Sequence, residues 1–461
     1  MMKILLISAG LLDKRTGGVP LYLEECISAL LSRGHIVHYL DPTGRDIHPG
    51  NIRRESSQRS DGLILTTLYN LRVVPDFGRG TLDPLEQVVP EPEMKNELGR
   101  FLEDYLPDLV HLHELIGFPI EAVRVFQARS IPVLLTAHDY YGLCPTIKLL
   151  LADGSACNLS NEQLVCKGCC CEGVSSAERK IYGAASALST LLPRKGGFNS
   201  WWPLLRRLVR STVRSSRKQS DYIERRHRFN HSLQSLDGIL AVSKTVANLY
   251  QAIGGCKNNV SVEHPTRHTI RTRPCERGDR TRNTPLRALV LNVQRRPKGL
   301  DLLRQELDWL LKSGEQGIRL QAWGCSSMVH PLIDNLGAYR DGDLDAICQN
   351  ADVGVVPSIW REAYGFVGAE MLSRGLPVIA SNCGAMKEYI AQGHDGLLFD
   401  PGQPGDLAAR LSSLARNPDS LATLSAGARE GWRKFQTVEA HVARLEIIYQ
   451  NAIERRKRGP L

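Results

Sequence analysis

The sequence lacks any apolar run that approaches the roughly 20 residues needed for a membrane-spanning helix. Its longest apolar runs, such as residues 131–135, have only the length of a strand. It shows no internal repeat of the solenoid type. The first residues contain no small-residue cleavage site, so the opening run is interpreted as a strand and not as a signal peptide. We therefore expect a cytoplasmic protein.

Composition excludes two further classes of protein. The chain has 461 residues, of which 42% are hydrophobic and 23% charged. These shares are close to globular averages, so wholesale disorder and a fibrous repeat are both excluded. The length suits two or three domains. Twelve cysteines in a cytosolic chain do not indicate a disulfide framework.

Positive charge is concentrated in one segment. Residues 174–231 hold thirteen Lys or Arg against three acidic residues, which accounts for the whole net charge of +9. The remainder is close to neutral, so we expect no nucleic-acid partner and one local anionic partner. Within this segment, Trp201, Trp202 and interleaved arginines over residues 201–218 fit an interfacial helix on an anionic membrane. An amphipathic helix with a solvated face is the alternative.

Short apolar runs alternate with helical patterns along the chain, which predicts parallel sheets with helices on both faces. A first series of runs lies at 3–8, 35–41, 108–113, 132–138, 238–243 and 260–264. A second lies at 287–293, 320–324, 352–357, 377–381 and 396–399. We predict an N-terminal domain (1–266, with a Cys-rich loop 144–171 and a basic helical insertion 174–231), a linker (267–285), a C-terminal domain (286–436) and a final helix (437–461).

The stretch WREAYGFVGAEMLS, residues 360–373, carries the most specific chemistry. It follows a predicted strand, and Gly365 is expected to open a helix. Glu362 and Glu370 are eight residues apart, about 12 Å on one continuous helix, so they cannot form a close acid–base pair. They can contact opposite ends of a long ligand, with backbone N–H groups near Gly365 facing a diphosphate. The alternative is a helix with two solvated glutamates.

This stretch resembles the E-x7-E signature of retaining GT-B glycosyltransferases of glycosyltransferase family 4. Other segments resemble the same family in order and spacing: Gly17-Gly18-Val19, the strand ends at 107–113 and 136–140, residues 241–244, and residues 374–384. The resemblance implies two tandem doubly wound Rossmann-like domains facing a cleft, with the C-terminal helix packing back on the N-terminal domain. It further implies an acceptor site in the N-terminal domain and a nucleotide-sugar site in the C-terminal domain.

The resemblance also implies roles for single residues. It places Glu362 at the donor sugar, His138 beside the transferred sugar and Glu370 at the nucleotide ribose. The backbone of the remaining matched positions would meet the phosphates: Gly17, Gly18, Gly365 and Phe366. The leaving diphosphate gains negative charge during transfer, so donors and cations aimed at it would stabilise the transition state.

The cationic part of the phosphate site departs from the family pattern. Residues 292–299 keep a Lys-Gly pair, Lys298-Gly299, but Val293 stands where the family has an arginine. We predict that Lys298 contacts the phosphates. Arg295 or Arg296 is the candidate replacement, since a guanidinium binds anions with a planar fork; two solvated surface arginines are the alternative.

Histidines and cysteines give weaker signals. His111 and His113 are expected to face opposite sides of their strand, and neither is predicted to be catalytic. Cys144, Cys157, Cys166 and Cys169 have the spacing C-x12-C-x8-C-x2-C, which allows a tetrahedral structural zinc site. A reduced, metal-free loop is equally compatible with this spacing.

The sequence thus predicts a retaining glycosyltransferase. It would move a sugar from a nucleotide-diphosphate sugar to a saccharide or lipid-linked saccharide acceptor, in cell-surface polysaccharide biosynthesis. No cofactor is expected for catalysis, and a peripheral location on the inner face of the membrane is predicted from residues 201–218. The rival is a catalytically weak scaffold or binding subunit at the membrane, for which Val293 is the main argument.

Overall fold

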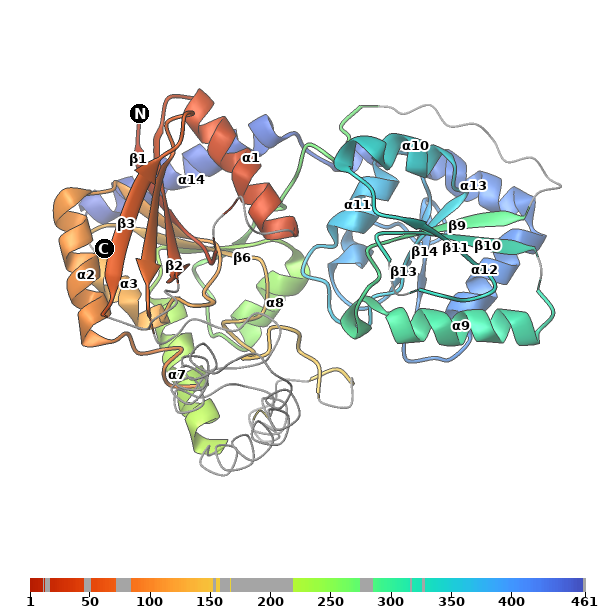
Figure 1. Cartoon of the computed structure of the whole chain (residues 1–461), viewed down its shortest axis with the longest axis horizontal. Coiled ribbons are helices and arrows are strands. Elements are labelled where there is room, and N and C mark those ends of the chain that lie inside the picture. Colours follow the sequence, from red (N-terminus) through yellow and green to blue (C-terminus); the bar gives the residue numbers. More distant parts are fainter. Residues whose placement is uncertain are drawn as a thin grey trace, which may run out of the picture. The chain divides into compact units, whose positions relative to one another are not determined.

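The computed structural model describes residues 1–10, 12, 17–44, 51–71, 84–151, 155–157, 166, 219–273, 285–315, 317–325 and 328–458. The chain divides into two compact units (Figure 1). Unit 1 comprises Met1–Ala241, Ala247–Val262 and Leu445–Leu461. Unit 2 comprises Val242–Val246 and Glu263–Arg444.

Unit 1 is built on an eight-stranded sheet in the described part of the chain, with the order β3-β4-β2-β1-β5-β6-β7-β8. Its strands are β1 (Lys3–Ile7), β2 (Ile36–Gly44), β3 (Arg53–Gln58), β4 (Ile64–Tyr69), β5 (Leu109–Leu112), β6 (Val133–Ala137), β7 (Gly238–Ala241) and β8 (Val260–Val262). All pairs are parallel except β3 with β4. β3 and β4 were not predicted. β3 is an edge strand of polar, mostly exposed residues, so it has no apolar pattern to detect.

The helices of unit 1 connect these parallel strands. Among the described residues they are α1 (Gly18–Ser32), α2 (Pro92–Asp104), α3 (Val123–Gln127) with the preceding 3-10 turn η2 (Ile120–Ala122), α7 (Gln219–Gln234) and α8 (Lys244–Ala252), whose first residues count with unit 2. β1 is the central strand, and its Ile4, Leu5, Leu6 and Ile7 are all buried. A strand buried on both faces needs apolar residues at successive positions, which is why this run was detected in the sequence.

The final helix, α14 (Val438–Arg458), ends in unit 1. Its buried Tyr449 makes a hydrogen bond of 2.7 Å between its hydroxyl and His111 Nδ1 in β5. Nearer its start, Glu446 forms an ion pair of 2.5 Å with Arg33, which follows α1. The prediction that the C-terminal helix packs back on the N-terminal domain is confirmed.

Unit 2 is built on a six-stranded parallel sheet in its described residues, with the order β11-β10-β9-β12-β13-β14. Its strands are β9 (Leu286–Leu291), β10 (Ile318–Trp323), β11 (Ile333–Gly337), β12 (Val353–Val356), β13 (Val378–Ser381) and β14 (Gly396–Phe399). All pairs are parallel. β11 was not predicted; it is an edge strand whose residues are partly buried or exposed.

Both faces of this sheet are covered by helices. The helices are α9 (Leu300–Lys312), α10 (Leu344–Gln349), α11 (Phe366–Leu372), α12 (Asp406–Arg416) and α13 (Pro418–Ala428). Successive side chains of β9 enter different cores: Ala288 and Val290 pack with leucines of α9 and α12, whereas Leu289 and Leu291 pack with residues of α10 and α11. The predicted architecture of two doubly wound, Rossmann-like domains is therefore confirmed. None of the described helices is long and apolar enough to cross a membrane.

Candidate functional site

Strand order locates the expected ligand site of unit 2. β9 and β12 are neighbours, and the chain continues from β9 toward β11 on one side and from β12 toward β14 on the other. Ligands of doubly wound sheets bind at the carboxyl ends of the strands where the order reverses. The loops that leave β9 and β12 lie at this point, and they contain Lys298 and Glu362.

Backbone packing fixes the loop that contains Lys298. Lys298 ends the 3-10 turn η4 (Arg296–Lys298), and Gly299 follows with φ +84°. A Cβ on Gly299 would lie 1.7 Å from the carbonyl oxygen of Pro357, directly after β12. In addition, the Ile359 N–H donates to the Pro297 carbonyl at 3.0 Å. Only glycine permits this close approach, which brings the two loops together.

Lys298 and Glu362 form an ion pair. Lys298 Nζ lies 2.7 Å from Glu362 Oε1, and the Ser358 hydroxyl donates to the same oxygen at 2.6 Å. The Lys298 side chain is 43% exposed and that of Glu362 only 7%. Burial by itself raises the pKa of Glu362, but the charge of Lys298 and the hydrogen bonds outweigh it, and the net pKa is lowered. Glu362 is thus an ionised carboxylate beside a cation that remains open to solvent.

A third loop holds the backbone of Glu362. The Ala385 N–H donates to the Glu362 carbonyl at 2.9 Å, and Glu362 pairs with Gly384 in an isolated parallel bridge. Gly384 has φ +109°, and a Cβ there would lie 2.5 Å from the Glu362 nitrogen. The loop after β13, which contains Gly384, is therefore part of the same site as the loops after β9 and β12.

Gly365 precedes α11 with φ +89°. Its carbonyl accepts a hydrogen bond of 2.8 Å from the Tyr389 hydroxyl, and a Cβ there would lie 2.9 Å from Met386 Cγ. Gly365 and Phe366 are both partly exposed. The beginning of α11 is therefore accessible from solvent, as a phosphate-binding role requires.

Glu370 lies within α11 and is buried. The Thr269 hydroxyl donates to Glu370 Oε1 at 2.6 Å, and Arg267 Nη1 lies 3.3 Å from the same oxygen. Burial raises the pKa of Glu370, and the hydrogen bond from Thr269 and the charge of Arg267 offset this only in part. The structure thus places Glu362 in the loop and Glu370 in the helix, at two separate polar positions of unit 2.

The structure describes Val293 and the two arginines predicted to replace the missing cation. Val293 is 3% exposed and packs in the hydrophobic core of unit 2, so the position where the family has arginine contributes no cation. Arg295 and Arg296 are exposed on either side of the start of η4. Their role at a phosphate stays a prediction.

Unit 1 has its own point of strand reversal, between β1 and β5. Gly17, with φ +137°, and Gly18 begin α1 after β1, and a Cβ on Gly17 would meet nothing within 4 Å. His138 follows β6 directly and is partly exposed. Residues 13–16 of the glycine loop lie outside the described residues.

His138 has a histidine partner. Its Nε2 lies 3.1 Å from Nδ1 of His113, and the two rings stack at a centroid distance of 5.4 Å. The expectation that His111 and His113 face opposite sides is wrong, because their ring centroids are only 4.0 Å apart. Side chains alternate along a strand, so residues i and i+2 share a face. His111 also bonds to the Thr136 hydroxyl at 2.8 Å.

Two predicted features fall partly or wholly outside the described residues. Residues 201–218, the predicted membrane segment, and Cys169 are among those not described. Cys144, Cys157 and Cys166 are free thiols. Among the described residues, no group of three or more His, Cys, Asp or Glu side chains could hold a metal ion. Because Cys169, the fourth predicted ligand, lies outside the described residues, the zinc site stays a prediction.

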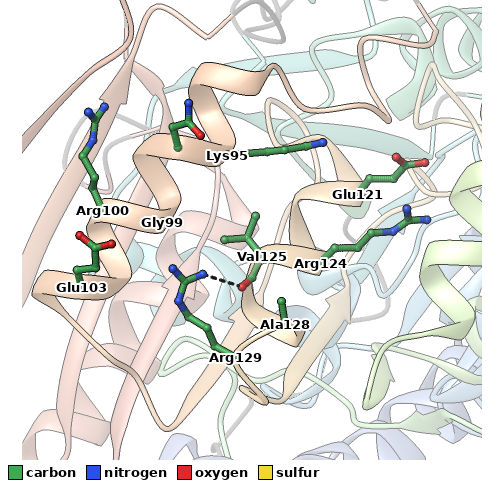
Figure 2. Close-up of a pocket in the computed structure, with 10 residues that line it drawn as sticks. Lys95, Gly99, Arg100, Glu103, Glu121, Arg124, Val125, Ala128 and Arg129 are labelled. Carbon is green, nitrogen blue, oxygen red and sulfur yellow. Dashed lines mark hydrogen bonds between the residues drawn. The ribbon is translucent and has the colours of Figure 1, made fainter.

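Two cavities lie apart from the Lys298–Glu362 pair. One of about 710 Å³ in unit 1 lies between α2 and α3, and Figure 2 shows Arg129 bonded to the Val125 carbonyl at its wall. Its charged lining residues are Lys95, Arg100, Glu103, Glu121, Arg124 and Arg129. One of about 500 Å³ in unit 2 is lined by Tyr364 and Ala385, which adjoin Gly365 and Gly384. Of these two cavities, the second borders the predicted donor residues.

Sequence reasoning assigned no role to four polar residues of these sites: Ser358, Arg267, Thr269 and His113. His113 follows β5 directly and Ser358 follows β12 by two residues, and such positions beyond strand ends favour ligand contact. Arg267 and Thr269 were assigned to a linker because the sequence around them is charged and contains proline. Their contacts with α11 leave no local pattern in the sequence.

Comparison with known proteins agrees with this geometry. The family model "Glycosyltransferase Family 4" matches residues 16–153. The model "Glycosyl transferases group 1" matches residues 333–431, which include both Glu362 and Glu370. A D-inositol 3-phosphate glycosyltransferase of Thermobispora bispora is 40% identical over 110 residues, which cover 23% of this chain and 24% of that relative. The match thus spans about a quarter of the relative's length.

Solved structures match nearly the whole chain. Sucrose-phosphate synthase from Thermosynechococcus elongatus superposes with a TM-score of 0.61 at 15% identity, over 98% of this chain and 99% of that one. HepE from Anabaena, in complex with UDP-glucose, gives a TM-score of 0.56 at 12% identity, over 98% and 100%. These likenesses concern the fold. They show the GT-B fold. The two family models show that this chain belongs to glycosyltransferase family 4.

Proposed function

We propose that this protein is an enzyme that transfers a sugar from a nucleotide-diphosphate sugar to a saccharide or lipid-linked saccharide acceptor, with retained anomeric configuration. One observation carries the proposal. A buried, ionised Glu362 is paired with a partly exposed Lys298 at the strand reversal of unit 2. Such a pair, next to an accessible beginning of α11, suits a ligand with a sugar joined to a diphosphate.

Lys298 supplies the positive charge that the leaving diphosphate requires. An ammonium group has three N–H donors, so Lys298 can keep its bond to Glu362 while it donates to a phosphate oxygen. The charge of the diphosphate increases as the glycosidic bond breaks, and a cation already in position stabilises that state. Glu362 would face the sugar, and Glu370 the ribose hydroxyls. We infer no need for a catalytic metal ion, because Lys298 and the N–H groups near Gly365 neutralise the phosphates.

The neighbours support a nucleotide-sugar donor. Structures with the same fold contain UDP-glucose in HepE from Anabaena and ADP in starch synthase IV from Arabidopsis thaliana. We assign the donor to unit 2 and the acceptor to unit 1, where His138 would act at the transferred sugar. Retention would follow if the acceptor attacks from the same face and the departing phosphate takes its proton. The acceptor class and a role in cell-surface polysaccharide synthesis are part of this proposal.

A panel of UDP-, GDP-, ADP- and dTDP-sugars tests the proposal. A donor at 100 times its dissociation constant should stabilise the wild type by about 2.7 kcal/mol, which thermal melting detects. With that donor, Lys298→Gln and Glu362→Ala should abolish transfer and donor hydrolysis. Gln keeps a hydrogen bond to Glu362 without the charge. Lys312→Ala, which removes an exposed lysine at the end of α9, is the matched control and should retain activity.

The buried Val293 favours one rival, a catalytically weak scaffold or binding subunit. The same assay separates the two. A wild type that melts higher with a nucleotide sugar but turns over none, and whose Lys298→Gln variant is equally inert, would support the scaffold and contradict the enzyme.

A further inference from the structure

The segment after β8 lies against α11. Thr269 and Ile270 are 2% and 3% exposed. The guanidinium of Arg374 donates to the Thr269 carbonyl at 2.6 Å, and the Arg271 N–H donates to the Ser373 hydroxyl at 3.1 Å. A segment attached at two points to the end of α11 holds its side chains in fixed positions relative to that helix.

Arg267 of this segment is 6% exposed and contacts two carboxylates. Nη1 lies 3.3 Å from Glu370 Oε1, and Nη2 lies 2.9 Å from Asp341 Oδ2. Its Cζ is also 6.0 Å from the centre of the Phe366 ring, in the first turn of α11. Arg267 therefore reaches both the carboxylate predicted to bind the ribose and the beginning of the helix.

The contacts on Glu370 are asymmetric. Both Thr269 and Arg267 bond to Oε1, and within the described residues no hydrogen bond reaches Oε2. A carboxylate has acceptor sites on both oxygens, so Oε2 can accept from a ligand hydroxyl. Two partners on one oxygen also fix the rotation of the carboxylate, so the direction of Oε2 is set before the ligand arrives.

We propose that Arg267 and Thr269 are positioning residues for Glu370 and make this site selective for ribonucleotide over 2′-deoxyribonucleotide donors. The inference rests on the proposed function, because it assumes a nucleotide in unit 2. An acceptor built to bind a ligand hydroxyl rejects the analogue that lacks it, since the acceptor is then left without a partner. Asp341 balances the charge of Arg267, and its ion pair with Nη2 fixes the position of the guanidinium beside Glu370.

Calorimetric titration with ribonucleoside diphosphates and their 2′-deoxy counterparts tests the inference. The wild type should bind the ribonucleotide at least about 10-fold more tightly, the effect of one hydrogen bond to a charged group. Arg267→Ala and Thr269→Val should each weaken ribonucleotide binding while the 2′-deoxy ligand binds as before. The readout is the ratio of ribonucleotide affinity to 2′-deoxyribonucleotide affinity. Arg267→Lys, which keeps the charge, should recover part of this ratio. Arg273→Ala, an exposed arginine of the same segment, should leave the ratio unchanged.

A double-mutant cycle with Glu370→Gln separates positioning from general damage. In the Glu370→Gln background, Arg267→Ala should change the ratio no further, because its target is already altered. Equal weakening of both ligands by Arg267→Ala and Thr269→Val, with normal melting, would overturn the inference while leaving the proposed donor site intact. A wild type that binds none of the ribonucleotides would overturn the proposed function and this inference with it.

Discussion

At the scale of single residues, the two glutamates of the E-x7-E stretch have opposite electrostatic environments. Glu362 pairs with Lys298, and its pKa is lowered from an ordinary 4.5 although the side chain is buried. Burial dominates at Glu370, whose pKa is raised despite Thr269 and Arg267. Folding therefore favours the ionised form of the first carboxylate and the neutral form of the second.

Opposite effects on stability follow for the two amide variants. Glu362 contributes to the free energy of unfolding above its unfolded pKa, and this contribution is lost as pH falls through the lowered, folded-state pKa. Glu362→Gln should therefore melt below wild type at pH 7.5 and approach it in acid. Glu370 contributes to the free energy of unfolding below its unfolded pKa, and this contribution is lost as pH rises through the raised, folded-state pKa. Glu370→Gln should therefore match wild type in acid and melt above it at pH 7.5. Shifts of the same sign for both variants would contradict these assignments.

The histidine pair gives a second prediction at this scale. Because His113 Nδ1 and His138 Nε2 share one hydrogen bond, the tautomer and the ring orientation of His138 are coupled to those of His113. His113→Ala should change the nitrogen NMR signals of His138 and lower transfer without abolishing donor binding. His227→Ala, which removes an exposed histidine of α7, is the matched control and should change neither observable. Unchanged His138 signals in His113→Ala would refute the coupling.

Residue roles were predictable from the sequence only where a motif carries them. Glu362, Glu370 and Lys298 stand in recognisable patterns, but their partners do not. Lys298 and Glu362 are 64 residues apart, and they meet only because β9 and β12 are neighbours in the sheet. Strand order is a property of the whole domain, so no local pattern could reveal this ion pair.

At the scale of elements, the turn between η4 and α9 determines where Lys298 lies. Gly299→Ala should lose stability for two reasons. The positive φ costs about 1–2 kcal/mol for any L-residue with a Cβ, and the clash with the Pro357 carbonyl adds about 1–3 kcal/mol. Gly314→Ala, at φ +74° with nothing within 4 Å of its Cβ, is the matched control and should show the first cost alone. Urea unfolding measures both, and equal losses would contradict the steric argument.

Most strands were predictable, including the edge strands β8 and β14, whereas β4 and the polar edge strands β3 and β11 were not. In β9, Ala288 to Leu291 are apolar at successive positions because alternate residues meet one of two cores, and in β1 Ile4 to Ile7 are all buried. β3 pairs with β4 alone and consists of polar residues, and β11 at the edge of unit 2 has the sequence IDNLG. Where an edge strand is polar and little buried, as β3 and β11 are, it leaves no apolar pattern in the sequence.

At the scale of the whole molecule, α14 joins the end of the chain to the sheet of unit 1. Tyr449→Phe would remove the hydroxyl that bonds to the buried His111 Nδ1 and should cost about 1–3 kcal/mol. Tyr339→Phe, which removes a hydroxyl bonded to Asn292 in unit 2, is a control for the loss of a tyrosine hydroxyl outside unit 1. Limited proteolysis of the C-terminal helix should be faster in Tyr449→Phe alone; equal rates in both variants would contradict this role of α14.

Charge distribution leads to a prediction for membrane contact. Wild type should sediment with vesicles that contain phosphatidylglycerol and not with neutral phosphatidylcholine vesicles, and salt should weaken the effect. Binding should be lost when four arginines of residues 201–218 become alanine: Arg206, Arg207, Arg210 and Arg214. The control removes an equal number of cations from the cavity of Figure 2: Lys95, Arg100, Arg124 and Arg129. Loss of vesicle binding in the control alone would contradict the prediction and would assign membrane contact to the surface around this cavity.

The buried position of Val293 has a consequence for protein engineering. A guanidinium installed there would enter a tightly filled apolar interior, where an unneutralised charge costs several kcal/mol, so Val293→Arg is a poor route to faster turnover. Positions 295 and 296 tolerate new side chains far better because both are open to water. Directed evolution for higher activity should therefore randomise these two codons and leave codon 293 untouched.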